Sequence, residues 1–179
     1  MREFVKSSHL RHCLGVNDFL ICAKHLSSLY PAITIQTMLH DFILKREMHD
    51  APVIPDGLIK FASGEAPCLW LEYDRKTEKE EAFKEKIKRM VALMEQGFDE
   101  WFETPLEQFT WAVATPFGDQ RARQLRYWCE QELTALHQIH RAPVFLFAAL
   151  PEHFDPAVIF LSPLWEIACE DGKHSLIEA

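Results

Sequence analysis

One stretch of the sequence, residues 67–73, is apolar on both faces of the strand that it predicts. Because side chains alternate along an extended chain, Leu69 and Leu71 share one face. Trp70 and Glu72 share the other face. A strand without a solvated face belongs in the middle of a sheet that helices cover on both sides. The sequence therefore predicts an α/β fold in which Glu72 lies at the edge of a buried region.

The rest of the chain predicts strands and helices around this central strand. Residues 57–61 form its hairpin partner, and residues 39–47 fit either a continued strand or a short helix. We expect one mixed sheet flanked by helices. The other predicted strands are 32–38, 109–115, 144–150 and 158–161, and predicted helices cover 16–29 and 119–140.

The clearest predicted helix opens with a capping box from Thr77 to Glu80. Apolar residues then recur at steps of three and four, which predicts that this helix packs on the sheet. Lys79 and Lys86 border the apolar stripe. The stripe consists of Phe83, Ile87, Met90, Val91, Met94, Phe98 and Trp101.

Length and composition fit one domain spanning residues 1–179, because 48% of the residues are hydrophobic and 26% are charged. The net charge of -8 argues against a broadly basic surface that coats nucleic acid, although a local patch can bind phosphate. The sequence has no membrane-length apolar run and no signal-peptide pattern, so we expect a cytoplasmic protein. Five scattered cysteines without a CxxC pair argue against a zinc ribbon.

Carboxylates at the ends of neighbouring strands form the candidate site. Asp56 precedes the strand 57–61, and Glu72 lies at the end of the adjacent strand. Hard cations such as Mg²⁺ select oxygen ligands, so these two acids predict a Mg²⁺ site. Asp18 on the first helix is a third candidate ligand, and Asp74, two residues after Glu72, is a fourth.

A metal nuclease also needs a cation that orients the attacking water or stabilises charge on the phosphate. Such an enzyme would carry a lysine two residues after Glu72, where this chain has Asp74. The amine would have to come from Lys86, Lys79 or Lys60, and we take Lys86 as the candidate catalytic lysine.

Each acid also has an ordinary structural interpretation. Asp56 fits a Pro-Asp-Gly turn, and Asp18 fits a helix cap. Glu72 could pair with Arg75 or with a lysine of the next helix, because a buried carboxylate needs a partner. For Glu72 the sequence leaves metal binding and ion pairing open.

A modest basic edge on the helix 119–140 is the candidate nucleic-acid contact. Arg121, Arg123 and Arg126 follow one another along this helix and could touch a DNA backbone. A solvated helix face explains the same three residues without DNA.

Several motifs occur together along the chain. They are His9 with residues 14–18 (LGVND), residues 54–57 (IPDG) and residues 69–78 (LWLEYDRKTE). Together these motifs resemble the bacterial plasmid replication-relaxation proteins, whose nuclease-like part is similar to the PD-(D/E)xK restriction-endonuclease fold. Weaker matches are Phe83 with Lys86, residues 111–115, Arg121 with Leu125, residues 145–147 and residues 163–165.

The resemblance implies a role in plasmid or mobile-element DNA metabolism. Asp56 would match the first acid of the nuclease motif, Glu72 the second, and Asp18 a helix acid that some members use. Asp74 departs from the motif, which has lysine at that position.

Members of the family often carry an N-terminal winged-helix DNA reader, for which this chain has no room before Ser8. We therefore expect weak DNA binding by the chain alone and a protein partner that supplies DNA recognition. Two functions stay open. One is a Mg²⁺-dependent DNA endonuclease, and the other is a catalytically inactive interaction module that assembles with a DNA-binding partner.

Overall fold

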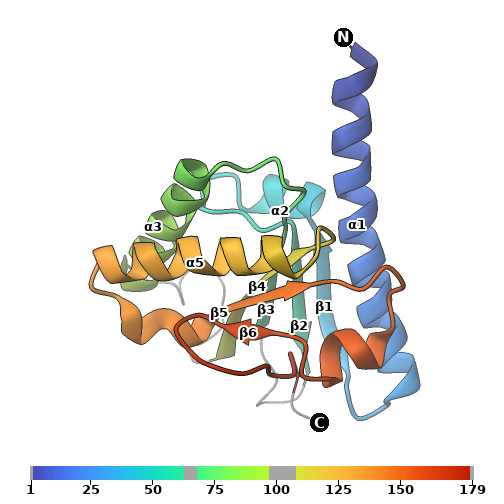
Figure 1. The fold of residues 1–179 in the computed structure, drawn as a ribbon. Coiled ribbons are helices and arrows are strands. Elements are labelled where there is room, and N and C mark those ends of the chain that lie inside the picture. The colour runs from blue at the N-terminus through green and yellow to red at the C-terminus, as the bar shows by residue number, and fades with distance from the viewer. Residues whose placement is uncertain (1, 63–67, 97–107, 178–179) are drawn as a thin grey trace.

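The computed structural model describes residues 2–62, 68–96 and 108–177. These residues form one six-stranded sheet in the order β1-β2-β3-β4-β5-β6, flanked by helices (Figure 1). The strands are β1 (Ile35–His40), β2 (Gly57–Phe61), β3 (Cys68–Tyr73), β4 (Phe109–Thr115), β5 (Phe145–Ala149) and β6 (Glu166–Ile167). The helices are α1 (Arg2–Leu29), α2 (Asp41–Glu47), α3 (Glu80–Gln96) and α5 (Asp119–Ala135), with shorter turns η2 (Ile139–Val144) and η3 (Ala157–Leu161).

Strand directions place the start of β2 and the end of β3 at the same end of the sheet. β1, β2 and β3 form an antiparallel meander, whereas β3, β4 and β5 run parallel. Parallel neighbours need a crossover, and α5 connects β4 to β5 across one face of the sheet. The start of β2 pairs with the end of β3, since Gly57 is opposite Leu71. Asp56 and Glu72 are therefore neighbours because of the hairpin register.

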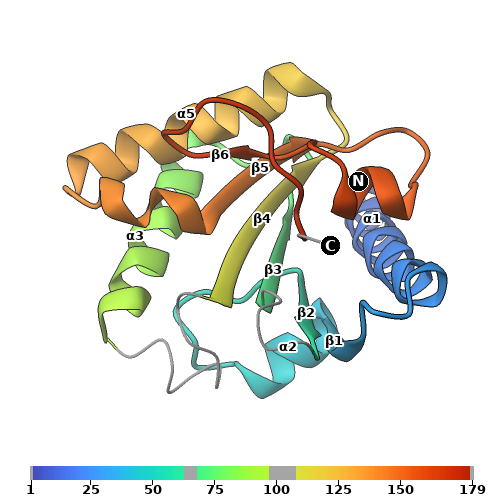
Figure 2. The same ribbon diagram turned by 90° about the horizontal axis from the view of Figure 1, so that it is seen from below.

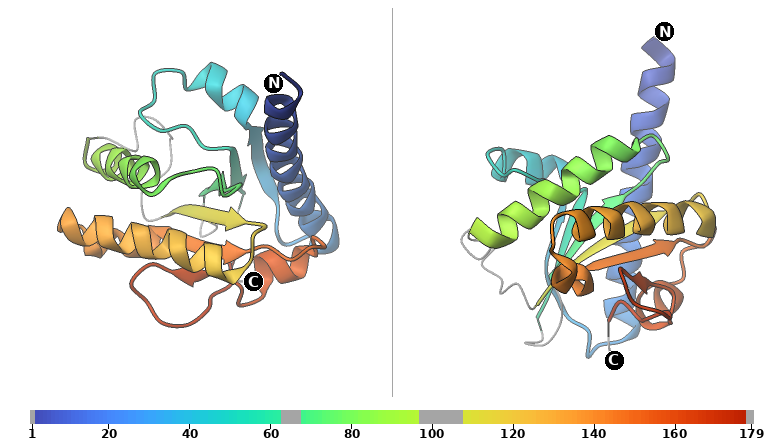
Figure 3. Two further views of the ribbon diagram at one scale, coloured as in Figure 1. Left: turned by 45° about the horizontal axis from the view of Figure 1, so that its top comes forward. Right: turned by 60° about the vertical axis from the view of Figure 1, so that its left-hand side comes forward.

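Helices cover both faces of the sheet. Figures 2 and 3 show α3 and α5 together on one face, with α1 and the C-terminal segment on the other. Trp70 and Trp111 pack with α3 and α5 in one core cluster. Leu71 and Phe19 pack in the second cluster, between the sheet and α1. The sequence prediction of an α/β fold with a sheet between helices is confirmed.

β3 has the environment that its sequence predicts. All six of its residues are buried. Trp70 belongs to the cluster beneath α3, and Leu69 and Leu71 belong to the cluster beneath α1. The predicted hairpin is also confirmed, because β2 and β3 pair antiparallel.

Two predicted boundaries change at the start of the chain and around α2. α1 begins at Arg2 rather than at residue 16. The undecided segment 39–47 divides between strand and helix, because β1 continues to His40 and α2 follows at once. The His40 imidazole Nδ1 accepts a hydrogen bond from the backbone N–H of Phe42, which caps the new helix.

The predicted capping box is wrong, because α3 begins at Glu80 instead of directly after Thr77. The Glu80 carboxylate binds Lys84 at 2.6 Å on its own helix rather than returning to cap the first turn. Glu78 binds Lys86 instead. The buried stripe is confirmed from Phe83 to Met94, and the predicted positions Phe98 and Trp101 lie outside the described residues.

The C-terminal third departs furthest from its predicted elements. Residues 158–161 form the π-helical turn η3 and not a strand, because the Asp155 carboxylate accepts the N–H groups of Ala157 and Val158. Ile159 and Phe160 are then buried against α1. α5 ends at Ala135, before the predicted residue 140, and β6 is an edge strand that the sequence did not indicate.

None of the helices among the described residues is both long and apolar enough to cross a membrane.

Gly15 allows α1 to approach β3 closely. A Cβ atom at this position would lie 2.3 Å from Cζ of the Tyr73 ring, which is inside van der Waals contact. Tyr73 is itself buried and belongs to the same core cluster as α1. The absence of a side chain at Gly15 therefore sets the distance between the helix and the sheet.

We expect Gly15→Ala to destabilise the protein, although alanine ordinarily favours a helix over glycine by about 1 kcal/mol. The added methyl group must displace the Tyr73 ring, and overpacking of this kind costs about 1–3 kcal/mol. Urea unfolding should show the loss. Asn17→Ala, at an exposed position of the same helix, is the control and should change stability little. A Gly15→Ala protein more stable than wild type would contradict this packing.

Candidate functional site

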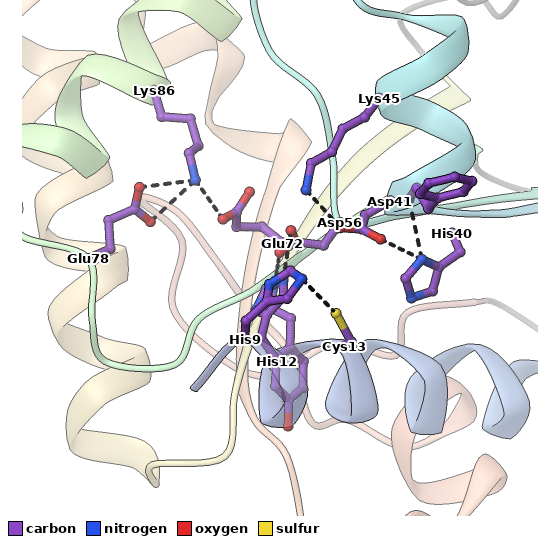
Figure 4. Close-up of polar contacts among 12 residues, drawn as sticks. His9, His12, Cys13, His40, Asp41, Lys45, Asp56, Glu72, Glu78 and Lys86 are labelled. Carbon is purple, nitrogen blue, oxygen red and sulfur yellow. Dashed lines mark hydrogen bonds and ion pairs between the residues drawn. The ribbon is translucent and has the colours of Figure 1, made fainter. Parts of the chain in front are cut away.

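A pocket of about 340 Å³ opens at the end of the sheet that contains the C-terminal end of β3. Four parts of the chain supply its polar side chains: α1, the β2–β3 hairpin with the residue before it, the connection between β3 and α3, and α3 itself. Figure 4 shows five of the lining side chains, His12, Asp56, Glu72, Glu78 and Lys86, gathered in this pocket. The lining residues are His12, Asp56, Glu72, Tyr73, Asp74, Arg75, Thr77, Glu78 and Lys86.

Asp56 is fixed against the edge of β3. Its Oδ2 accepts the backbone N–H of Tyr73 at 2.8 Å, and its own N–H donates to the carbonyl of Leu71 at 2.9 Å. Its Oδ1 lies 3.0 Å from Nε2 of His12. These contacts give Asp56 a defined orientation toward the pocket, which a turn residue would not need.

His12 lines the pocket although the sequence did not indicate it as a site residue, and the same holds for Glu78 and Arg75. His12 comes from α1, and its hydrogen bond to Asp56 raises the pKa of the imidazole above its usual value of 6.5, against the lowering effect of burial. The nearby carboxylates of Glu72 and Asp41 act in the same direction as Asp56. His12 lies four residues before the buried Val16 and so falls on the same face of α1. This spacing could have indicated that His12 faces the sheet.

Glu72 is buried in the pocket wall with 6% of its surface exposed. Its Oε1 accepts a hydrogen bond from Nζ of Lys86 at 2.6 Å. Burial raises the pKa of Glu72 to about 7, because desolvation and the charges of Asp56 and Glu78 outweigh the attraction of Lys86. Glu72 therefore accepts a proton far more readily than an ordinary glutamate.

Lys86 reaches the pocket from α3 and contacts two carboxylates. Its Nζ lies 2.6 Å from Glu72 and 3.0 Å from Oε1 of Glu78. Burial alone would lower the pKa of Lys86, but the two carboxylates raise it, so the amine stays charged. Of the three lysines considered from the sequence, Lys86 lines the pocket, whereas Lys79 and Lys60 do not.

Asp74 is held by a buried arginine. Nε and Nη2 of Arg121 donate to its two oxygens at 2.8 and 2.9 Å, and Thr115 donates to Oδ2 at 3.3 Å. Nη2 of Arg121 also donates to the carbonyl of Glu78 at 3.0 Å. Both oxygens of Asp74 are therefore engaged, and the pair fixes the turn that carries Glu78.

The structure brings Asp56, Glu72 and Lys86 together and places Asp18 elsewhere. Asp18 is exposed on α1 and lines a different pocket with His25. Within the described ranges, the structure has no cluster of three or more His, Cys, Asp or Glu residues arranged to hold a metal ion. Mg²⁺ is commonly bound through one or two carboxylates plus water, which is the set that Asp56 and Glu72 could offer.

The predicted basic edge contains one exposed arginine. Arg121 is buried with Asp74, as described above. Arg126 donates to Glu130 at 2.7 Å and to Glu166 at 2.8 Å. Arg123 is exposed on α5. Nucleic-acid binding by these residues stays a prediction, and two of the three charges are already neutralised.

Comparison with protein families gives a match over the part of the chain that builds most of the pocket. A family model described as replication-relaxation matches residues 1–102 of the 179 residues. Comparison with curated proteins and with solved structures found no match. The matched range includes His12, Asp56, Glu72 and Lys86.

Glu72 should make stability depend on pH in a defined direction. Its folded pKa of about 7 lies above the ordinary value of 4.5, so between these values the folded state holds a proton that the unfolded chain releases. The free energy of unfolding contributed by Glu72 therefore falls as pH rises from about 4.5 to about 7. Urea unfolding of wild type and Glu72→Gln across this range measures the effect. We expect a smaller decrease in Glu72→Gln, and parallel curves would contradict the raised pKa.

Removing Arg121 should destabilise the fold strongly. Arg121→Met leaves the buried Asp74 carboxylate without its cation, which costs about 3–5 kcal/mol. The double variant Asp74→Leu with Arg121→Met should recover much of that loss, because no buried charge then remains. Arg123→Met, two residues along the same helix and exposed, is the control. Equal urea midpoints for Arg121→Met and wild type would show that the pair does not support the fold.

Proposed function

Because the chain belongs to the replication-relaxation family, we propose that it acts in plasmid or mobile-element DNA processing, as a Mg²⁺-dependent endonuclease of restriction-endonuclease-like fold. The contact that carries the proposal is the 2.6 Å bond between Lys86 and Glu72 beside Asp56. Lys86 thereby brings an amine to the two acids. The nuclease motif would have that amine at position 74, where this chain has Asp74.

The topology supports the nuclease-like part of the proposal. An antiparallel meander is followed by a helix and a parallel strand, with one acid before β2 and one near the end of β3. This arrangement is similar to the PD-(D/E)xK fold that the motifs resemble. In the proposed function, Asp56 and Glu72 would take the two acid positions of that pattern.

The proposed chemistry divides among the residues by their contacts. Asp56 and Glu72 would hold Mg²⁺, which supplies a hydroxide nucleophile and offsets charge on the scissile phosphate. Lys86 would orient the attacking water or stabilise negative charge on the phosphate, because its amine stays protonated between two carboxylates. His12 holds the second oxygen of Asp56 in place.

A second candidate function rests on a separate observation. Asp74 is bonded to Arg121 through both oxygens, and Asp56 and Glu72 already have cationic partners in His12 and Lys86. A site whose acids are already paired with internal cations suits a catalytically inactive module that keeps the fold and assembles with a DNA-binding partner. Cleavage assays separate the two functions.

Metal binding should depend on Asp56. We expect millimolar Mg²⁺ or Mn²⁺ to raise the melting temperature of wild type, since a ligand that binds the folded state stabilises it by mass action. Asp56→Asn should remove the shift while its amide oxygen still accepts the Tyr73 N–H. Asp18→Asn is the control, because Asp18 lines another pocket. An unchanged melting temperature of wild type across the metal titration would favour the inactive module.

Cleavage should depend on Glu72 and Lys86. Supercoiled plasmid with Mn²⁺ should be nicked by wild type, and Glu72→Gln and Lys86→Ala should lower the rate by about 10²-fold or more. Lys88→Ala, on the same helix and half-exposed, is the matched control and should keep its activity. Nicking that survives in Glu72→Gln would indicate a contaminating nuclease. If wild type nicks no substrate with any metal, the endonuclease activity would be excluded from the proposal.

A further inference from the structure

Arg75 differs from the other cations that line the pocket. His12 pairs with Asp56, and Lys86 pairs with Glu72. Arg75 makes no ion pair with any carboxylate in the part of the chain that the structure describes. Among the described residues, no carboxylate neutralises this guanidinium, which sets it apart from His12 and Lys86.

The Arg75 side chain is nevertheless held in place. Its guanidinium carbon lies 5.3 Å from the centre of the Phe117 ring. Its Nε–H is buried and has no acceptor among the described residues. The next residue, Lys76, has φ of 59°, a backbone conformation that costs a non-glycine residue energy. Arg75 is thus held in place with an unbonded Nε–H and no carboxylate partner. This arrangement indicates that a ligand supplies the anionic group.

Phe117 places an aromatic ring beside this guanidinium. It follows β4, the parallel neighbour of β3, and its backbone N–H donates to the Thr115 hydroxyl at 3.3 Å. Phe117 is 42% exposed, so the guanidinium does not cover the residue completely. An exposed aromatic ring next to a cation is the combination that binds a base and its phosphate in single-stranded nucleic acid.

We propose that Arg75 and Phe117 bind an unpaired DNA strand at the rim of the pocket. The Arg75 guanidinium takes a backbone phosphate, and the Phe117 ring stacks on the adjacent base. The inference rests on the proposed DNA-processing function and adds the form of the substrate, because a base inside a duplex does not expose a face for stacking.

Charge favours a single strand over a duplex at this position. The chain carries a net charge of -8, and Arg121 and Arg126 are neutralised by carboxylates. A rigid duplex would bring many phosphates near that surface, whereas a flexible strand can reach one local cation. Arg75 supplies that cation beside the acids of the pocket.

The test measures binding of a fluorescein-labelled single-stranded 20-mer by anisotropy, in EDTA and over a range of salt. Phe117→Ser should weaken binding about 10-fold, and Phe117→Trp should retain it, because stacking needs an aromatic face. Arg75→Gln should reduce the slope of log affinity against log salt by about 0.7, the value for one phosphate contact on a single strand. Arg75→Lys should keep the slope.

Lys24→Gln is the charge-matched control. Lys24 is exposed on α1, 12 residues beyond His12 and therefore roughly 18 Å along the helix. Its salt slope should equal that of wild type. Circular dichroism on each variant verifies that the fold is intact.

Several outcomes would overturn the inference: no binding by wild type, unchanged binding by Arg75→Gln and Phe117→Ser, or equal affinity for a blunt duplex. Because EDTA removes divalent metal, the result is independent of cleavage. Wild type that binds through both residues but never nicks plasmid would uphold this inference and remove the nuclease. If wild type nicks plasmid while Arg75→Gln and Phe117→Ser bind the single strand normally, the nuclease proposal would stand and this inference would be wrong.

Discussion

The buried pair of Asp74 and Arg121 is the interaction on which the arrangement of the site depends. It joins the end of β3 to the first turn of α5 through two charge-assisted bonds, and a third bond from Arg121 holds the Glu78 carbonyl. Two charges removed from water need this geometry, because either charge alone would be costly in the interior. The turn before α3 is thereby fixed, and with it the position of Glu78 beside Lys86.

The same pair explains why the amine of the pocket comes from α3. A lysine at position 74 would lie against the Arg121 guanidinium and would leave it without an anion. Lys86 instead approaches Glu72 from the helix that covers this face of the sheet. The ion pairs of the pocket form a network of charges that spans α1, the hairpin, the connection between β3 and α3, and α3. Mg²⁺ would have to compete with His12 and Lys86 for the carboxylate oxygens. Its affinity would therefore be lower than in a pocket whose carboxylates had no partners.

The family match and the structure describe different parts of this network. Residues 1–102 contain His12, Asp56, Glu72 and Lys86. Arg121 and Phe117 lie beyond the matched range and come from the β4–α5 region. The acids of the pocket thus belong to the family-matched part of the chain, while the support beneath them and the aromatic ring at the rim come from the later part.

The sequence by itself determined the central strand, its hairpin partner and the acids at their adjoining ends. These follow from alternation and hairpin register, which are local properties of the chain. It also narrowed the candidate lysines to three, of which helical spacing places Lys79 and Lys86 beside the buried stripe and Lys60 lies on the hairpin strand. Only the tertiary structure decided which lysine reaches Glu72, that His12 replaces Asp18 beside Asp56, and that Asp74 is bound by Arg121. Residues 74 and 121 are 47 positions apart, and residues 12 and 56 are 44 apart. Contacts over such separations are set by how helices pack on the sheet, which no local pattern of the sequence specifies.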